Sequence, residues 1–191
     1  RKAEIIKMLG ERGDQLATEQ VKKALFCPSP EVRAASARSL AQLEGREAVS
    51  ELIDYLRSYQ TAYDQVAGFS ALLTVLDSRK RDLVASALEG SGTHTRATML
   101  ILLAAGGENR FFDTVMQYTS SSEPRLREVA FMELKYVAGP HDLEEIIDLL
   151  MNTDDRSEIE QLQAAIVNAA MQVSGEEERI STVAESMKGS D

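Results

Sequence analysis

The sequence has no tryptophan, and among its 191 residues there are only one cysteine, two histidines and four prolines. One cysteine cannot form an internal disulfide, and with two histidines it cannot complete a four-ligand zinc site of the Cys/His type. The longest apolar run extends from Met99 to Ala105, far short of the roughly 20 residues that a membrane-spanning helix needs. We therefore expect a soluble protein without membrane insertion. These observations leave the compartment open, with the cytoplasm slightly favoured.

The charge of the chain is strongly biased towards acids. Aspartate and glutamate number 31 against 21 for lysine and arginine, which gives a formal net charge of -10 at pH 7. Such a surface repels the phosphates of nucleic acid. The composition therefore argues against a nucleic-acid partner and favours a protein or peptide partner that is basic.

Apolar residues recur at helical spacing. Val49, Leu52, Ile53 and Leu56 are three or four positions apart, so a helix places them on one face. The pair Ser29-Pro30 is typical of a helix start, because serine caps the first turn and proline fits its first position. The pattern predicts helices throughout and gives no support to strands.

The sequence also repeats itself. Residues 32–58, moved forward by 94 positions, fall without a gap on residues 126–152. Further copies are found by taking Arg33 as a reference position, which we call the anchor of its copy. The anchors of successive copies are 32, 31, 31 and 36 residues apart, namely Arg33, Gln65, Arg96, Arg127 and Gln163. Apolar residues follow each anchor by four positions (Val167 in the last copy) and by seven. Each copy is interpreted as two helices of about 12 to 16 residues, which must stack on neighbouring copies to bury their apolar faces.

Two segments carry a family resemblance. Ser29 to Leu40 and Glu123 to Ala130 resemble the first helix of a HEAT repeat. The resemblance implies an all-α, right-handed superhelix (solenoid) of about six HEAT-like hairpins, which forms a single domain over residues 1–191 and is monomeric. The expected units are 1–28, 29–60, 61–91, 92–121, 122–154 and 155–191, and we expect them to be a piece of a longer chain.

No catalytic group of residues emerges from the sequence. His141 falls in a predicted turn, His94 lies between two threonines, and Cys27 ends an apolar segment, which favours solvated histidines and a small buried thiol. Neither histidine precedes a glutamate, whereas the di-iron site of the related deoxyhypusine hydroxylases uses His-Glu pairs. The absence of tryptophan and the net charge of -10 argue against the repeat-built DNA glycosylases. We predict no enzyme activity, cofactor or metal.

The resemblance implies a protein-binding scaffold that uses the concave face lined by second helices. If Val49, Leu52, Ile53 and Leu56 face inward, the intervening positions face outward, and the register continues through the other copies. The candidate partner-binding residues are Glu51, Asp54, Tyr55, Ser86, Gln117, Glu145, Asp148, Leu149 and Glu185. Acids beside the two apolar residues of this set favour a basic, partly apolar peptide.

Two other functions stay open. One is an enzyme accessory or phycobilin-lyase-like repeat protein, because those lyases share this type of repeat. The other is a structural spacer that holds two flanking domains apart and binds no partner of its own.

Overall fold

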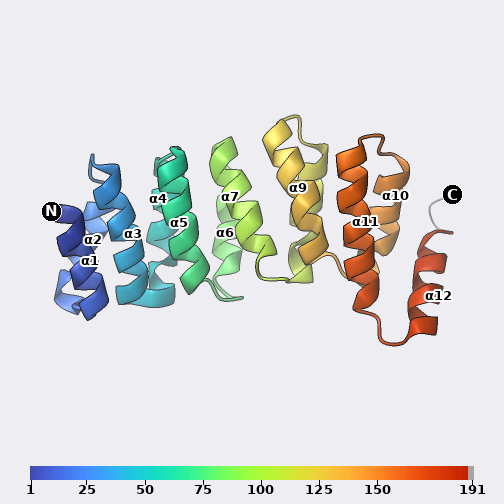
Figure 1. Ribbon diagram of the computed structural model, residues 1–191, viewed down its shortest axis with the longest axis horizontal. Helices are drawn as coiled ribbons and strands as arrows, with labels where there is room; N and C mark the ends of the chain where they lie inside the picture. The colour runs from blue at the N-terminus through green and yellow to red at the C-terminus, as the bar shows by residue number, and fades with distance from the viewer. Residues whose placement is uncertain (189–191) are drawn as a thin grey trace. The chain divides into compact units, whose positions relative to one another are not determined.

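The computed structural model describes residues 1–188, which are helical almost throughout (Figure 1). No β-strand occurs in this part of the chain. The α-helices are α1 (Lys2–Arg12), α2 (Thr18–Ala24), α3 (Pro30–Glu44), α4 (Val49–Ser58), α5 (Ala62–Val75), α6 (Arg81–Ala87), α7 (Thr93–Ala104), α8 (Phe112–Met116), α9 (Pro124–Val137), α10 (Leu143–Met151), α11 (Arg156–Met171) and α12 (Glu176–Ser186). The predicted all-α class is confirmed.

Within residues 1–188 the helices follow one another as six hairpins, each with an odd-numbered first helix and an even-numbered second helix. The first helices have 11 to 16 residues, close to the predicted length. The second helices are shorter than predicted, and α8 has only 5 residues. The reason is that short 3-10 segments, such as η3 (Asn109–Phe111) before α8, replace part of the predicted second helix.

The first helices begin where the sequence indicates. The side chain of Ser29 accepts a hydrogen bond from the backbone N–H of Val32, and the side chain of Asp155 accepts bonds from two N–H groups of the first turn of α11. Pro30 and Pro124 occupy the first positions of α3 and α9, where no N–H is needed. Local capping therefore fixes where each of these hairpins starts.

Backbone hydrogen bonds correct one predicted register. From the second hairpin to the sixth, the N–H that bonds to the carbonyl four residues back, on the residue just before the first helix, belongs to Arg33, Gln65, Arg96, Arg127 and Ile159. The anchor of the last copy is thus Ile159, and Gln163 lies one turn further along α11. Val167, the apolar residue four positions after Gln163, is 59% exposed. Apolar periodicity alone caused this error, because it does not distinguish registers that differ by one helical turn.

The contacts divide the chain into two compact units, residues 1–102 and residues 103–191, with the division inside α7. In the first unit α3 packs against both α1 and α5, the second helix α2 packs against α3, and the second helix α4 packs against α5. In the described part of the second unit α9 packs on α11, and α10 packs on α11 and α12. Stacked hairpins of this kind form an α-solenoid, so the fold class is confirmed within each unit. The single domain over residues 1–191 stays a prediction.

The predicted inner faces form the core. Val49, Leu52, Ile53 and Leu56 of α4 are at most 4% exposed. The position seven residues after the anchor is fully buried in four successive copies, as Leu40, Leu72, Leu103 and Leu134. Within residues 1–188 no helix combines the length and the apolar character that crossing a membrane requires.

Candidate functional site

The predicted partner-binding residues of the first unit lie on α4 and α6, which pack against each other. Asp54 and Ser86 are exposed, as predicted. Glu51 is half-buried, and its Oε1 atom lies 3.0 Å from Nζ of Lys22. The same ammonium group lies 2.8 Å from Oε1 of Glu44. Part of the charge of Glu51 is therefore neutralised within the chain.

Tyr55 was predicted to face outward, and this is wrong. Its side chain is fully buried, and its hydroxyl donates a hydrogen bond to Oδ1 of Asp64 at 2.8 Å. The physical reason is that α4 packs against several elements, including α5 and α6, so the buried arc of the helix is wider than a single apolar stripe. A tyrosine suits such a position when its hydroxyl has a partner.

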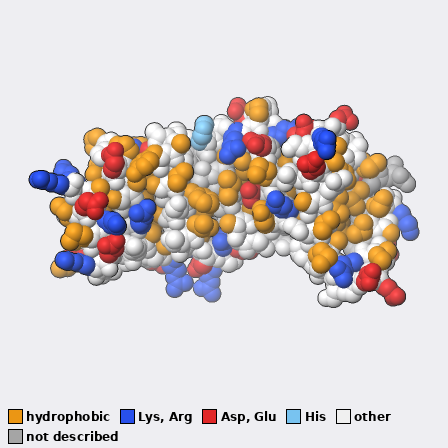
Figure 2. All heavy atoms as spheres, viewed as in Figure 1, with side chains coloured by type: hydrophobic (Ala, Val, Ile, Leu, Met, Phe, Trp, Pro, Cys, Tyr) orange, Lys and Arg blue, Asp and Glu red, His pale blue; other side chains and the backbone are white. Residues whose placement is uncertain are grey.

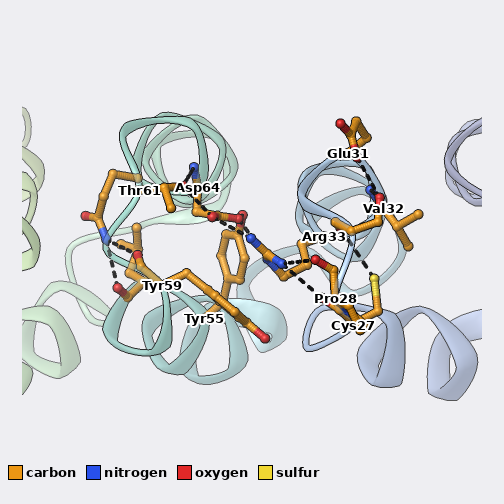
Figure 3. Close-up of polar contacts among 12 residues, drawn as sticks. Cys27, Pro28, Glu31, Val32, Arg33, Tyr55, Tyr59, Thr61 and Asp64 are labelled. Atoms are coloured by element: carbon orange, nitrogen blue, oxygen red, sulfur yellow. Dashed lines mark hydrogen bonds and ion pairs between the residues drawn. The ribbon is translucent and has the colours of Figure 1, made fainter.

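Asp64 is the centre of a buried polar network (Figure 3). The guanidinium of Arg33 donates to both carboxylate oxygens, from Nε at 2.9 Å and from Nη2 at 2.7 Å. The hydroxyl of Thr61 donates to Oδ2 at 2.5 Å. Arg33 also donates to the carbonyls of Cys27 and Pro28 and lies 3.9 Å from the ring centroid of Tyr59.

The electrostatics of this network indicate a structural role. Burial by itself raises the pKa of Asp64, but the hydrogen bonds from Arg33, Thr61 and Tyr55 outweigh it and hold that pKa below its ordinary value. Burial and the bond to Asp64 raise the pKa of the Tyr55 hydroxyl. The carboxylate already accepts four hydrogen bonds. It therefore has little capacity left for a ligand or a metal ion.

The pair of Arg33 and Asp64 joins α3 to α5, and equivalent contacts join other hairpins. Arg127 on α9 pairs with Glu158 on α11, with Nη2 of the arginine 2.6 Å from Oε2 of the glutamate. Gln65 on α5 donates instead to the hydroxyl of Thr95 on α7, at 3.2 Å. We call these contacts, each between an anchor residue and the first turn of the next first helix, the hairpin clamps.

In the second unit three carboxylates lie within electrostatic range of Glu145. Asp113 lies on α8, Asp142 lies just before α10, and Glu145 and Asp148 lie on α10. Burial raises the pKa of Asp142, and repulsion by Asp113 raises it further, against a backbone hydrogen bond from Gly139 that lowers it. Burial raises the pKa of Glu145 in the same way, with added repulsion from the other three acids. We call these four residues the acidic face.

The surroundings of the acidic face are partly apolar. Leu149 is half-buried, and Met151, one turn beyond Asp148 on α10, is 73% exposed. Within residues 1–188 no lysine or arginine forms an ion pair with Asp113, Glu145 or Asp148. The acidic face therefore combines uncompensated negative charge with an exposed apolar side chain.

The predicted partner-binding residues and the acidic face overlap only in part. Glu145 and Asp148 belong to the acidic face, whereas Gln117 and Glu185 are exposed on η4 (Gln117–Ser120) and α12. Sequence reasoning missed Asp113 and Asp142. Asp113 is one turn before Gln117 on the same arm and could have been found by extending the register, whereas Asp142 lies in a 3-10 segment, outside the helical pattern.

The histidines and the cysteine form no alternative centre. His94 and His141 are exposed, and Cys27 is half-buried, with Sγ 3.4 Å from the carbonyl oxygen of Ser29. Among the described residues, no three side chains of the His, Cys, Asp or Glu type are grouped as a metal ion would need.

Comparison with known proteins supports the predicted resemblance. Residues 2–72 match the family model described as HEAT repeats. No curated protein matches the chain. Among solved structures, the chain is similar to the complex of CpcE and CpcF of phycocyanin lyase from Nostoc sp. PCC7120, with 20% sequence identity and a TM-score of 0.46, covering 97% of this chain and 71% of that chain. The identity and the TM-score are too low for this likeness to carry an argument about function.

Proposed function

We propose that this chain, in which residues 2–72 match HEAT repeats, is a non-catalytic protein-binding module. The second unit supplies the binding surface, and the acidic face binds a basic, partly apolar peptide. The observation that supports this proposal is that Glu145 is partly buried, is repelled by Asp113, Asp142 and Asp148, and forms no ion pair within residues 1–188, because a group whose charge is already unfavourable gains most from an incoming cation.

The chemistry of the ligand follows from the two kinds of surface present. Lysine or arginine side chains offset the repulsion that Asp113 and Asp148 exert on Glu145. An apolar side chain of the ligand gains contact area against Met151, which is 73% exposed. Because these charges lie near solvent, the affinity falls as salt concentration rises. Because burial and repulsion raise the pKa of Glu145, the affinity also falls as the pH is lowered and that carboxylate becomes protonated.

The test uses fluorescent peptides and two charge-matched variants. A peptide of lysine and leucine residues is compared with one in which glutamate replaces lysine and one in which serine replaces leucine. The variant Glu145→Gln with Asp148→Asn removes two charges from the acidic face. The control Glu177→Gln with Glu178→Gln removes two charges from exposed positions on α12. Fluorescence anisotropy gives the affinities, and circular dichroism checks that helicity is unchanged.

We expect the lysine-leucine peptide to bind best and to lose about tenfold in affinity with the acidic-face variant but not with the control. Equal losses with both variants would show that only net charge matters and would contradict the proposed site. No binding by any peptide would favour a structural spacer instead. The variant Asp54→Lys with Asp148→Lys, compared with Asp148→Lys alone, tests whether the exposed acid of α4 belongs to the same surface.

A further inference from the structure

A concave surface lies in the first unit, between α3 and α5. It is a groove of about 840 Å³, within the range of sites that hold ligands. Ala34, Arg38 and Ala41 line it from α3, and Tyr63, Val66 and Ala67 line it from α5. Figure 2 views the molecule from the side of these first helices and shows hydrophobic side chains exposed over α3 and α5, with both cationic and acidic side chains near them at the α1 and α3 end.

Small side chains create the groove. Ala34 and Ala41 are two helical turns apart on α3, and Ala67 and Ala71 are one turn apart on α5, so all four line the groove without filling it. The lining on α5 runs from Tyr63 to Val75, which at 1.5 Å per residue corresponds to about 18 Å. That length suits a peptide segment of about five or six extended residues better than a compact small molecule.

Apolar side chains are exposed at one end of the groove. Tyr63 is 55% exposed and Val66 is 65% exposed. Both line the groove. Two large exposed apolar side chains beside an alanine floor give a ligand apolar surface to cover.

The cations of the groove differ in how far they are neutralised. Nη1 of Arg46 lies 3.5 Å from Oδ2 of Asp77, and this ion pair closes one end. Arg38 is exposed, and no carboxylate within residues 1–188 forms an ion pair with it. A smaller hollow of about 250 Å³ on its other side shares Ala34, Arg38 and Tyr63 with the groove and is also lined by Glu4 and Glu31. Arg38 therefore lies next to apolar surface without an ion pair in the described part of the chain, and Lys7 lines the same hollow as Glu4 and Glu31.

From these features we infer that the groove between α3 and α5 binds a partner segment in which an aspartate or glutamate lies beside aliphatic or aromatic residues. The carboxylate pairs with the guanidinium of Arg38, and the apolar side chains cover Tyr63, Val66 and the alanine floor. This ligand has the opposite charge to the one proposed for the acidic face and binds a different unit. The two proposals therefore stand or fall separately.

A peptide selection tests the inference and does not require the partner to be identified first. A phage-displayed library of random peptides is first depleted on the variant Arg38→Glu with Val66→Glu and is then selected on the unaltered chain. Selected peptides are synthesised, and their affinities are measured for Arg38→Glu, for Val66→Ser and for the control Glu145→Gln with Asp148→Asn. Because Arg38 and Val66 are exposed, the variants should keep the stability of the parent, which urea unfolding verifies.

We expect selected peptides to combine acidic and apolar residues and to lose about tenfold in affinity with either groove variant but not with the control. Amide shifts in NMR spectra should move at Ala34, Ala41 and Ala67. Selection of basic peptides, equal affinity for Arg38→Glu, or shifts confined to α8 and α10 would overturn the inference. Self-association that Val66→Ser abolishes would overturn it too, because the occupant would then be a second copy of the chain.

Discussion

Replacing Asp64 by alanine is expected to destabilise the first unit strongly. The side chain of Arg33 is only 7% exposed, so the substitution leaves a buried guanidinium without its carboxylate. The carbonyls of Cys27 and Pro28 still accept from it, but they carry no charge. Removal of one partner from a buried ion pair costs about 3 to 5 kcal/mol. The Tyr55 hydroxyl also loses its acceptor, which places the expected loss towards the upper end of that range.

Urea unfolding followed by circular dichroism measures this loss, and two variants separate its causes. Tyr55→Phe removes a single donor to the carboxylate and should cost about 1.5 kcal/mol. Arg33→Met combined with Asp64→Leu removes both charges and should restore most of the stability that Asp64→Ala loses, because no charge then remains buried and unpaired.

The pH dependence gives an independent check. The pKa of Asp64 is lower in the folded protein than its ordinary value, so the ionised carboxylate stabilises the fold above the ordinary pKa. That contribution disappears as the pH falls through the lower, folded pKa. The parent should therefore lose more stability on acidification than Asp64→Asn does. A loss of only about 1 kcal/mol for Asp64→Ala, as in an exposed ion pair, would refute the reasoning.

Three further changes test other parts of the fold. Burial raises the pKa of Glu133 to about 7, so the folded state holds a proton that the unfolded state releases, and stability falls as the pH rises from about 4.5 to 7. In urea melts Glu133→Gln should therefore be about 1 to 2 kcal/mol more stable than the parent at pH 8 but little more stable at pH 5. Leu103→Ala should cost about 2 to 5 kcal/mol in the same assay, because Leu103 is fully buried. Gly68→Ala should lower the melting temperature, since the added Cβ would lie 2.5 Å from Cδ2 of Leu56 and overpacking costs about 1 to 3 kcal/mol.

Much of the fold could be predicted from local patterns. The spacing of Val49, Leu52, Ile53 and Leu56 located the buried face of α4, and Ser29-Pro30 located the start of α3. These features depend on residues within one helix, so the sequence alone expresses them. The anchor of the last copy was misplaced because apolar spacing was used there, although the cap at Asp155 marks the correct register.

The site could be predicted less well, because it depends on contacts between helices. Tyr55 belongs to the buried network only because Asp64 lies on the next helix, nine residues away. Asp142 belongs to the acidic face because Asp113, from the preceding hairpin, lies within electrostatic range. Helical periodicity describes one helix at a time and carries no information about either pairing.

The hairpin clamps have a consequence for the order of the hairpins along the chain. Arg33 meets Asp64 and Arg127 meets Glu158, whereas Gln65 meets Thr95. An engineered chain that joined the second hairpin directly to the fourth would set the buried cation of Arg33 against the uncharged Thr95. Such a junction would carry an unpaired buried charge, whereas the three native clamps match charge with charge or amide with hydroxyl. The hairpins are therefore not interchangeable modules, and deletion or shuffling of this array should succeed only where the two sides of each new junction are of the same polar type.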